Sequence, residues 1–366
     1  MLKTIRIRNM RGVKEATIDN LTQVNILIGR NGVGKSTLLE AVYLASSWHN
    51  LRDEIRGVDK IDYVVRRRGF RGGWKEFKQT IWFQKNVEQA IDVILKFHSG
   101  KQLSFKIPYN TEEAVWLEIP GEAFGKISGY FYHTVYYNAH TLRASDPWFR
   151  TWTTLDLDLH LKLLRTLDIE RETRFLQDVV LIDSRLIISD IERNVWPKLL
   201  ARRLDKLILD VVREGFEVYV EDLTFIPTPM GSFVLALKTP ETVIEVDGLG
   251  DGVRNAIAVS SILASVKDTL VLVEDPEIHL HPGGLAVLMR FMLRMARERN
   301  LQLIMSTHSV ELVNIARRLC EELNMDLNVY FMERGREGVV ETRILKGFDV
   351  DVLQKLGLDP RLLEVL

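Results

Sequence analysis

One glycine-rich loop, set between an apolar run and a helical pattern, constrains the fold of this chain more than any other feature. Residues 23–29 read QVNILIG, residues 29–36 read GRNGVGKS and residues 38–46 read LLEAVYLAS. The loop matches G-x-x-x-x-G-K-[ST], in which glycines let successive backbone N–H groups turn towards phosphate oxygens. The pattern therefore predicts a nucleoside triphosphate site between a strand and the N-terminus of a helix.

The residue types of this loop predict individual roles. We expect Lys35 to reach the β- and γ-phosphates and the hydroxyl of Ser36 to bind Mg²⁺. The predicted nucleotide-binding residues are Gly29, Arg30, Asn31, Gly32, Val33, Gly34, Lys35, Ser36 and Thr37.

A second apolar run, residues 270–273, ends in two acids. Hydrolysis at such a loop needs an acid near Mg²⁺ and a group that orients water, and ligands gather where parallel strands end. Glu274 is therefore the predicted Mg²⁺-side acid and Asp275 the predicted water-activating carboxylate, with Glu277 as an auxiliary acid.

Two histidines, His279 and His281, follow these acids and raise the alternative of a metal site. Zinc is disfavoured because no cysteine lies nearby and the acids already have roles. Two interpretations stay open: the histidines shape a loop that faces nucleotide or a partner subunit, or they only pack.

The rest of the chain predicts an α/β fold with a central sheet. Short aromatic-rich runs and a hairpin at Ser99-Gly100 indicate an antiparallel β insertion, and a helical lobe follows, returning to strands at EVYV (217–220) and SFVLAL (232–237). A strand, a helix over roughly 284–299 and another strand then alternate, as in a parallel sheet. The predicted domains are residues 1–50 with 240–366, residues 51–145 and residues 146–239.

Composition excludes several classes of protein. The 49 basic and 50 acidic residues nearly cancel, which excludes a globally basic nucleic-acid coat but not a local basic patch. The single cysteine, Cys320, excludes a disulfide framework and fits a reducing compartment. The N-terminal residues do not resemble a signal peptide, and no apolar run approaches the roughly 20 residues that span a bilayer. We expect a cytoplasmic protein without a membrane partner.

Four segments together resemble ABC-type ATPases of the RecF/SMC/OLD group. EDPEIHLHP (274–282) is similar to the extended Walker B motif and D-loop, and RIRNMRG (6–12) to the IxNFRG opening. LGDGVR (249–254) stands where the signature motif is expected, and STHS (306–309) matches the switch histidine. The resemblance covers roughly residues 1–50 and 245–310, and it implies an ABC-ATPase-like head that uses ATP and Mg²⁺.

The resemblance also implies an arrangement of two subunits. In this group two heads sandwich two ATP molecules, so a homodimer is expected, and a higher oligomer stays open. Arg11 would approach the nucleotide, His308 would hydrogen-bond the γ-phosphate, and His281 would face the other subunit. The partner's γ-phosphate would meet Gly250, Asp251 and Gly252.

This chain departs from the usual pattern of the group. Gly250 replaces the usual signature serine, and the acid pair runs Glu-Asp rather than Asp-Glu, so slow turnover is expected. The Q-loop glutamine cannot be assigned, although Gln79 and Gln84 are candidates.

Two segments of the chain are rich in basic residues. The run RRRGFRGGWK places aromatic residues beside five bases, and the predicted nucleic-acid contacts are Arg66, Arg67, Arg68, Arg71 and Lys75. The alternative is a solvated loop paired with acids. A second stripe reads as an exposed helix face and comprises Lys198, Arg202, Arg203 and Lys206.

A nuclease domain in the same chain is not expected, because too few residues follow Ser309 and the pair Asp349 and Asp351 reads as chance. A separate nuclease or effector protein is the alternative. The leading hypothesis is an ATPase head that dimerises around ATP and gates binding to DNA or an effector, in repair, chromosome maintenance or defence. The alternatives are a non-hydrolysing ATP-dependent switch and a transporter's nucleotide-binding subunit.

Overall fold

The computed structural model describes residues 1–69, 71–110, 114–120, 122, 134–138, 141–145, 152–154, 157–229 and 231–345. Phe70 of the first basic segment and the pair Asp349 and Asp351 lie outside these ranges.

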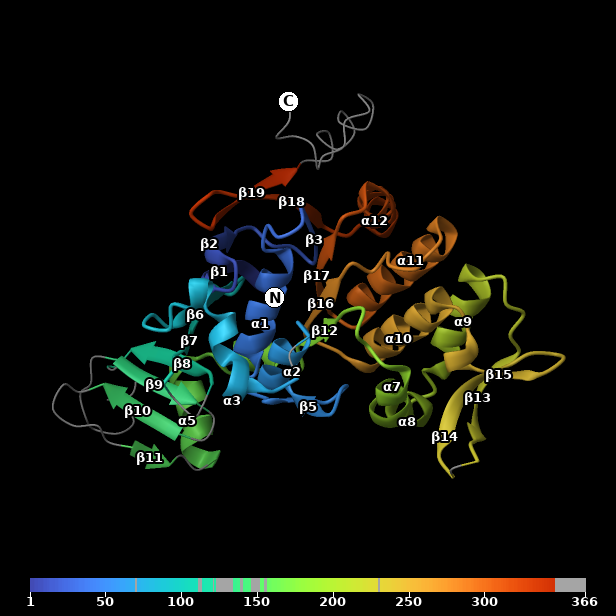
Figure 1. Ribbon diagram of the computed structural model, residues 1–366, viewed down its shortest axis with the longest axis horizontal. Coiled ribbons are helices and arrows are strands. Elements are labelled where there is room, and N and C mark those ends of the chain that lie inside the picture. The colour runs from blue at the N-terminus through green and yellow to red at the C-terminus, as the bar shows by residue number, and fades with distance from the viewer. Residues whose placement is uncertain are drawn as a thin grey trace.

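A single large mixed sheet organises the described residues (Figure 1). Its fourteen strands run in the order β11-β10-β9-β8-β7-β6-β1-β2-β19-β18-β3-β17-β16-β12. Five neighbouring strands at one end are parallel, and these are β18 (Leu327–Arg334), β3 (Val24–Ile28), β17 (Gln302–Thr307), β16 (Leu270–Glu274) and β12 (Val180–Ile182). The α/β fold class predicted from the sequence is confirmed.

Helices cover both faces of the parallel strands, which is why these strands are largely apolar and mostly buried. Leu27 of β3 packs into one core cluster with α1 (Lys35–Ser46), whereas Ile26 and Ile28 point into the other. The second cluster includes residues of α9 (Asp205–Gly215), α10 (Asp251–Ser265), α11 (Pro282–Glu298) and α12 (Val310–Leu323). These helices lie together on the right in Figure 1.

The antiparallel strands extend the same sheet from the other side of β1. Strand β6 pairs with β1, so the strands of the predicted insertion continue the N-terminal part of the sheet. The hairpin at Ser99-Gly100 is confirmed, with Gly100 at φ 85°. The other nine strands of the sheet are β1 (Leu2–Met10), β2 (Val13–Ile18), β6 (Ile91–Phe97), β7 (Gln102–Ile107), β8 (Trp116–Pro120), β9 (Thr134–Asn138), β10 (Thr141–Ser145), β11 (Trp152–Thr154) and β19 (Val339–Leu345). Of these, β19 lies between β2 and β18 and pairs parallel with β2.

Smaller elements surround this frame. The helices are α2 (Lys60–Arg66), α3 (Trp74–Phe77), α5 (Leu157–Leu167), α6 (Glu170–Gln177), α7 (Ile188–Asn194) and α8 (Trp196–Ala201), with short 3₁₀ turns at η1 (Lys78–Ile81), η2 (Phe83–Lys85) and η3 (Val246–Gly248). The remaining strands are β4 (Arg52–Asp53), β5 (Val58–Asp59), β13 (Asp222–Pro227), β14 (Phe233–Lys238) and β15 (Val243–Glu245). Within the described part of the chain, no helix combines the length and the apolar character needed to span a bilayer.

Two local expectations were wrong. The segment EVYV (217–220) is not a strand. It belongs to the connection between α9, which ends at Gly215, and β13, which begins at Asp222. Residues 180–182, inside the predicted helical lobe, form β12 of the central sheet. The domain boundaries themselves remain a prediction.

Candidate nucleotide-binding site

The predicted motifs meet because parallel strands end at the same edge of the sheet. Ile28 of β3 lies opposite Thr307 of β17, and Ser306 lies opposite Glu274 of β16. The phosphate loop, the acid pair and the segment with His308 therefore leave the sheet side by side.

The backbone of the phosphate loop requires glycine at two positions. Gly34 has φ 116°, and a Cβ there would lie 2.7 Å from Cγ2 of Val13. Gly29 has φ 156°, and a Cβ there would lie 2.5 Å from the carbonyl oxygen of Met332. Lys35 is buried and donates a hydrogen bond of 2.6 Å to the carbonyl oxygen of Gly29. The ammonium group of Lys35 is thus hydrogen-bonded to the backbone of its own loop.

A cavity of about 630 Å³ opens over this loop, within the size range of ligand sites in proteins. Its lining combines predicted residues from segments far apart in the chain with residues that were not predicted. The lining residues are Arg11, Gly12, Asn31, Gly32, Gly34, Lys35, Ser36, Thr37, Arg68, Thr80, Asp275, Ser306, His308 and Arg334. Neither Gln79 nor Gln84 is among them.

Asp275 has the electrostatic setting of a proton acceptor. Burial raises the pKa of its carboxyl to about 6, and the neighbouring Glu277 and Glu274 act in the same direction, while Lys35 opposes them. Burial also lowers the pKa of Lys35 to about 8. A carboxylate with a pKa near neutrality is a better general base than one with an ordinary pKa.

Glu277 holds the segment that carries His308. Its Oε1 accepts a hydrogen bond from the hydroxyl of Thr307 and another, of 3.2 Å, from the backbone N–H of His308. The extended acid motif thereby fixes the loop after β17, and the auxiliary-acid role of Glu277 remains a prediction.

Several oxygen atoms at this edge have no hydrogen-bond partner among the described residues. They are Oδ1 of Asp275, Oε2 of Glu277 and Oγ of Ser306, all buried. Buried polar atoms are rarely left unpaired, and oxygen ligands suit Mg²⁺. With Ser36 in the same cavity lining, the site fits a triphosphate with its magnesium ion.

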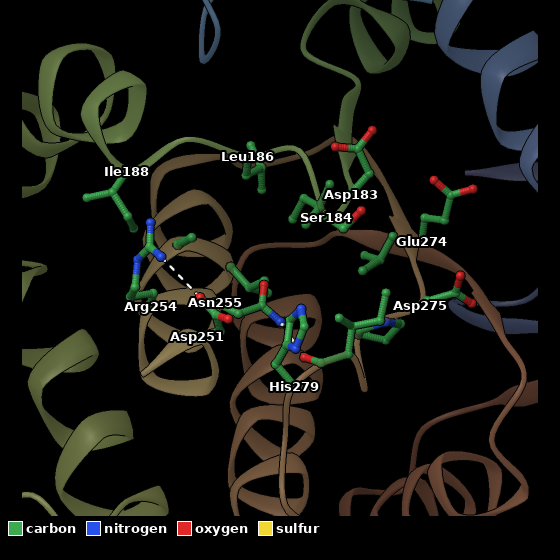
Figure 2. Close-up of a pocket in the computed structure, with 16 residues that line it drawn as sticks. Asp183, Ser184, Leu186, Ile188, Asp251, Arg254, Asn255, Glu274, Asp275 and His279 are labelled. Carbon is green, nitrogen blue, oxygen red and sulfur yellow. Dashed lines mark hydrogen bonds and ion pairs between the residues drawn. The ribbon is translucent and has the colours of Figure 1, made fainter. Parts of the chain in front are cut away.

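Glu274 is not among the residues that line this cavity. Its carboxylate pairs with the guanidinium of Arg67, and it lines a smaller cavity of about 180 Å³ near Asp183 and His279 (Figure 2). Its role towards Mg²⁺ remains a prediction.

The two histidines have different surroundings. Nδ1 of His281 accepts a hydrogen bond of 3.3 Å from the backbone N–H of Gly283 and caps the N-terminus of α11. His279 has φ 64° and lines the smaller cavity. The structure describes no group of three or more His, Cys, Asp or Glu residues arranged to hold a metal ion. Capping gives His281 a local role, and contact with a second subunit stays a prediction.

The signature segment begins α10 and does not line the phosphate-loop cavity of its own chain. Gly250 is the N-cap and is exposed, and Arg254 bridges Asp247 and Asp251 at 3.1 Å each. A Cβ on Gly252 would lie 2.6 Å from the carbonyl oxygen of His279, so this position requires glycine. The predicted role of these residues towards a second copy is untested.

The predicted nucleic-acid segment needs correction. Arg67 is buried in ion pairs with Glu40, Asp183 and Glu274, so it is not available to phosphates. Trp74 is only 5% exposed and cannot stack on a base. The remaining bases are exposed, although Arg68 pairs with Glu40, and they stay predicted contacts: Arg66, Arg68, Arg71 and Lys75.

Glu40 and Asp183 were not among the residues predicted from the sequence. Glu40 is wholly buried and pairs with Arg11, Arg67 and Arg68. An acid inside the apolar helical run LLEAVYLA signals a buried charge, and VVLID ends in an acid just as LVLVED does. Both signals were available in the sequence.

Comparisons with known proteins match this chain to ATPase families. Residues 1–118 match the family described as "AAA ATPase domain", and residues 142–314 match "AAA domain, putative AbiEii toxin, Type IV TA system". A Helicobacter pylori protein named ATP/GTP phosphatase is 23% identical over 349 residues, which are 88% of this chain and 89% of that protein.

Two further proteins are similar to this chain, one over a smaller share of its own length and one at lower sequence identity. The OLD nuclease of Thermus scotoductus is 23% identical over 338 residues, which are 84% of this chain but 59% of the nuclease. The SMC head domain from Thermotoga maritima is 13% identical, with a TM-score of 0.46 over 94% of this chain and 99% of that one. The resemblance inferred from the sequence is confirmed: the chain is similar to ABC-type ATPases of the RecF/SMC/OLD-like group.

Proposed function

We propose that this chain binds ATP with Mg²⁺, hydrolyses the γ-phosphate, dimerises around ATP and couples these steps to DNA or an effector protein. The observation that carries the proposal is the single cavity into which the phosphate loop, Asp275 and His308 all project. Three segments distant in sequence contribute the residue types that such hydrolysis needs.

The hydrolytic step follows from the residues around the cavity. Backbone N–H groups of the loop and Lys35 bind the phosphates, and bound Mg²⁺ supplies charge neutralisation. Asp275 orients water and accepts its proton, for which its raised pKa is suited. His308 lies in the same lining and donates to the γ-phosphate. Because Asp275 has a shorter side chain than the usual glutamate, we expect slow turnover.

The proposed dimer rests on the exposed N-terminus of α10. Gly250 and Asp251 are exposed, and the first turn of a helix presents free backbone N–H groups that bind phosphate. In a two-subunit sandwich this turn would meet the ATP of the second copy. The missing serine hydroxyl at Gly250 would weaken that contact without removing it.

The regulated partner is DNA or an effector protein. Similarity to a protein named OLD nuclease supports a link to DNA, in repair, maintenance or defence. If cleavage is part of the process, a separate nuclease supplies it.

Phosphate release tests the proposal most simply. ATP is supplied with Mg²⁺, with and without duplex DNA, and Lys35→Ala is the matched blank. We expect slow release by the wild-type chain, at least about 10-fold above the blank. Stimulation by DNA supports a DNA-gated head, whereas unchanged turnover points to a protein partner. ATP binding without release above the blank would refute hydrolysis and leave an ATP-dependent switch.

A further inference from the structure

Arg67 is a buried arginine that joins three elements around the nucleotide edge. Its Nη1 lies 2.7 Å from Oε1 of Glu40 on α1, and its Nε lies 3.0 Å from Oδ2 of Asp183 after β12. Its Nη2 pairs with Oε2 of Glu274 at the end of β16. The side chain of Arg67 is 5% exposed, so these acids are its principal surroundings.

The three acids are brought together by the fold. Ile182 lies opposite Val273 in the parallel pair β12 and β16, which places the next residues, Asp183 and Glu274, at neighbouring strand ends. Figure 2 shows both carboxylates extending away from His279. Carboxylates this close would repel one another, and a planar guanidinium can bind several of them at once.

The position of Glu274 matters because of its neighbour. Asp275, the next residue, lines the nucleotide cavity, whereas the Glu274 carboxylate is turned towards Arg67. A carboxylate that is held through one oxygen keeps its second oxygen for another ligand. Outer partners of this kind orient metal-binding groups and tune metal affinity.

We infer that Arg67 is a positioning residue: its ion pair with Glu274 fixes the end of β16 for Mg²⁺ and for the Asp275 side chain. The inference rests on the proposed function, since it concerns the same site. Arg67 itself does not line the nucleotide cavity, so it acts through Glu274.

The other partners of Arg67 show why Glu274 depends on it most. Glu40 also pairs with Arg11 and Arg68, and Asp183 also pairs with Arg56 and accepts a hydrogen bond from the Tyr63 hydroxyl. Among the described ion pairs of Glu274, Arg67 is the partner. Loss of the Arg67 guanidinium should therefore change the position of Glu274 more than that of the other two acids.

Arg67→Lys tests the inference because it retains the positive charge but removes the planar guanidinium that contacts three acids at once. The matched control is Arg174→Lys, in an exposed ion pair with Glu170 on α6. Calorimetry measures ATP affinity in EDTA and with Mg²⁺, and thermal unfolding of the metal-free chain checks folding. We expect unchanged affinity in EDTA and a Mg²⁺-dependent gain reduced by about 10–100-fold in Arg67→Lys only.

A folded Arg67→Lys chain with the full Mg²⁺-dependent gain would overturn the inference. If Arg67→Lys does not fold, Asp183→Asn replaces it, because this change removes one partner that fixes the arginine. A reduced gain in Asp183→Asn then supports the inference and an unchanged gain overturns it. If the wild-type chain binds no ATP under either condition, the proposed function itself fails, and the two failures are distinguishable.

Discussion

Two segments of this chain are both rich in basic residues but have different surroundings. The first basic segment, residues 66–75, places Arg67 deep among acids, while Arg66, Arg71 and Lys75 remain exposed. The second basic segment, residues 198–206, keeps its four basic side chains exposed, and its lysines and arginines lie on α8, on α9 and in the turn between them.

The difference between the segments follows from their partners. The first segment lies next to buried or half-buried acids at the ends of β12 and β16 and on α1. The second segment lies on the exposed surface of two helices and the turn between them. A run of bases in a sequence therefore does not indicate which of them face solvent. Isolated acids within apolar runs, such as Glu40, indicate where a base must be buried.

Removing the buried arginine should have the largest effect. Arg67→Ala leaves three buried or half-buried carboxylates without a shared counter-charge, and breaking a buried pair in this way costs about 3–5 kcal/mol. Chemical denaturation compares the free energy of unfolding with that of Arg66→Ala, its exposed neighbour. Equal stabilities of the two variants would contradict the account of the first segment.

A second large effect is expected at Lys60, which lines a cavity of about 440 Å³ together with Lys198 and Arg202 of the second segment. Burial lowers the pKa of Lys60 from 10.5 to about 8. Both states are protonated below pH 8, so the cost of burying the charge is fully present there and disappears as pH rises from 8 to 10.5. This cost is about 3 kcal/mol.

Lys60→Met should therefore be more stable than the wild-type chain at pH 7, by up to about 3 kcal/mol, and the gain should shrink above pH 8. Loss of the 2.9 Å hydrogen bond to Ser46 offsets the gain by about 1 kcal/mol. Unfolding by denaturant at pH 7 and at pH 9.5 measures the stability gain at each pH. A stability gain of Lys60→Met that grows with pH would contradict this prediction.

The exposed bases of the first segment should affect partner binding and not stability. The triple variant Arg66→Ala, Arg71→Ala and Lys75→Ala should weaken duplex DNA binding by about 10-fold at low salt and reduce its salt dependence. Fluorescence anisotropy at two salt concentrations measures this. Unchanged affinity and salt slope would remove this loop from the predicted DNA contacts.

The second segment supplies the matched control and the smallest expected effect. Replacing its four bases by alanine should change the free energy of unfolding by about 0.5 kcal/mol or less per site and leave DNA affinity unchanged. A larger loss of DNA affinity here than in the triple variant would reverse the comparison between the segments.

Much of the site could be predicted because its chemistry is local in sequence. The phosphate loop needs glycines beside Lys35 and Ser36, and Asp275 follows an apolar strand, so both signals are continuous stretches. Strand ends in a parallel sheet then bring such stretches together.

The missed contacts depend on residues far apart in the chain. Arg67 and Glu274 are 207 residues apart, and no local pattern joins them. The strand β12 was missed because three apolar residues between helical segments do not establish a period. The ion pair of Glu274 with Arg67 could not be predicted from the acid motif alone.

The most direct test of the central claim is a calorimetric titration of ATP with Mg²⁺ into the wild-type chain and into Lys35→Ala. The account predicts saturable binding of about one ATP per chain and affinity at least about 10-fold weaker in Lys35→Ala, with both chains folded. Equal affinity in the two chains, or no binding by the wild type, would contradict the assignment of this edge of the sheet as an ATP site.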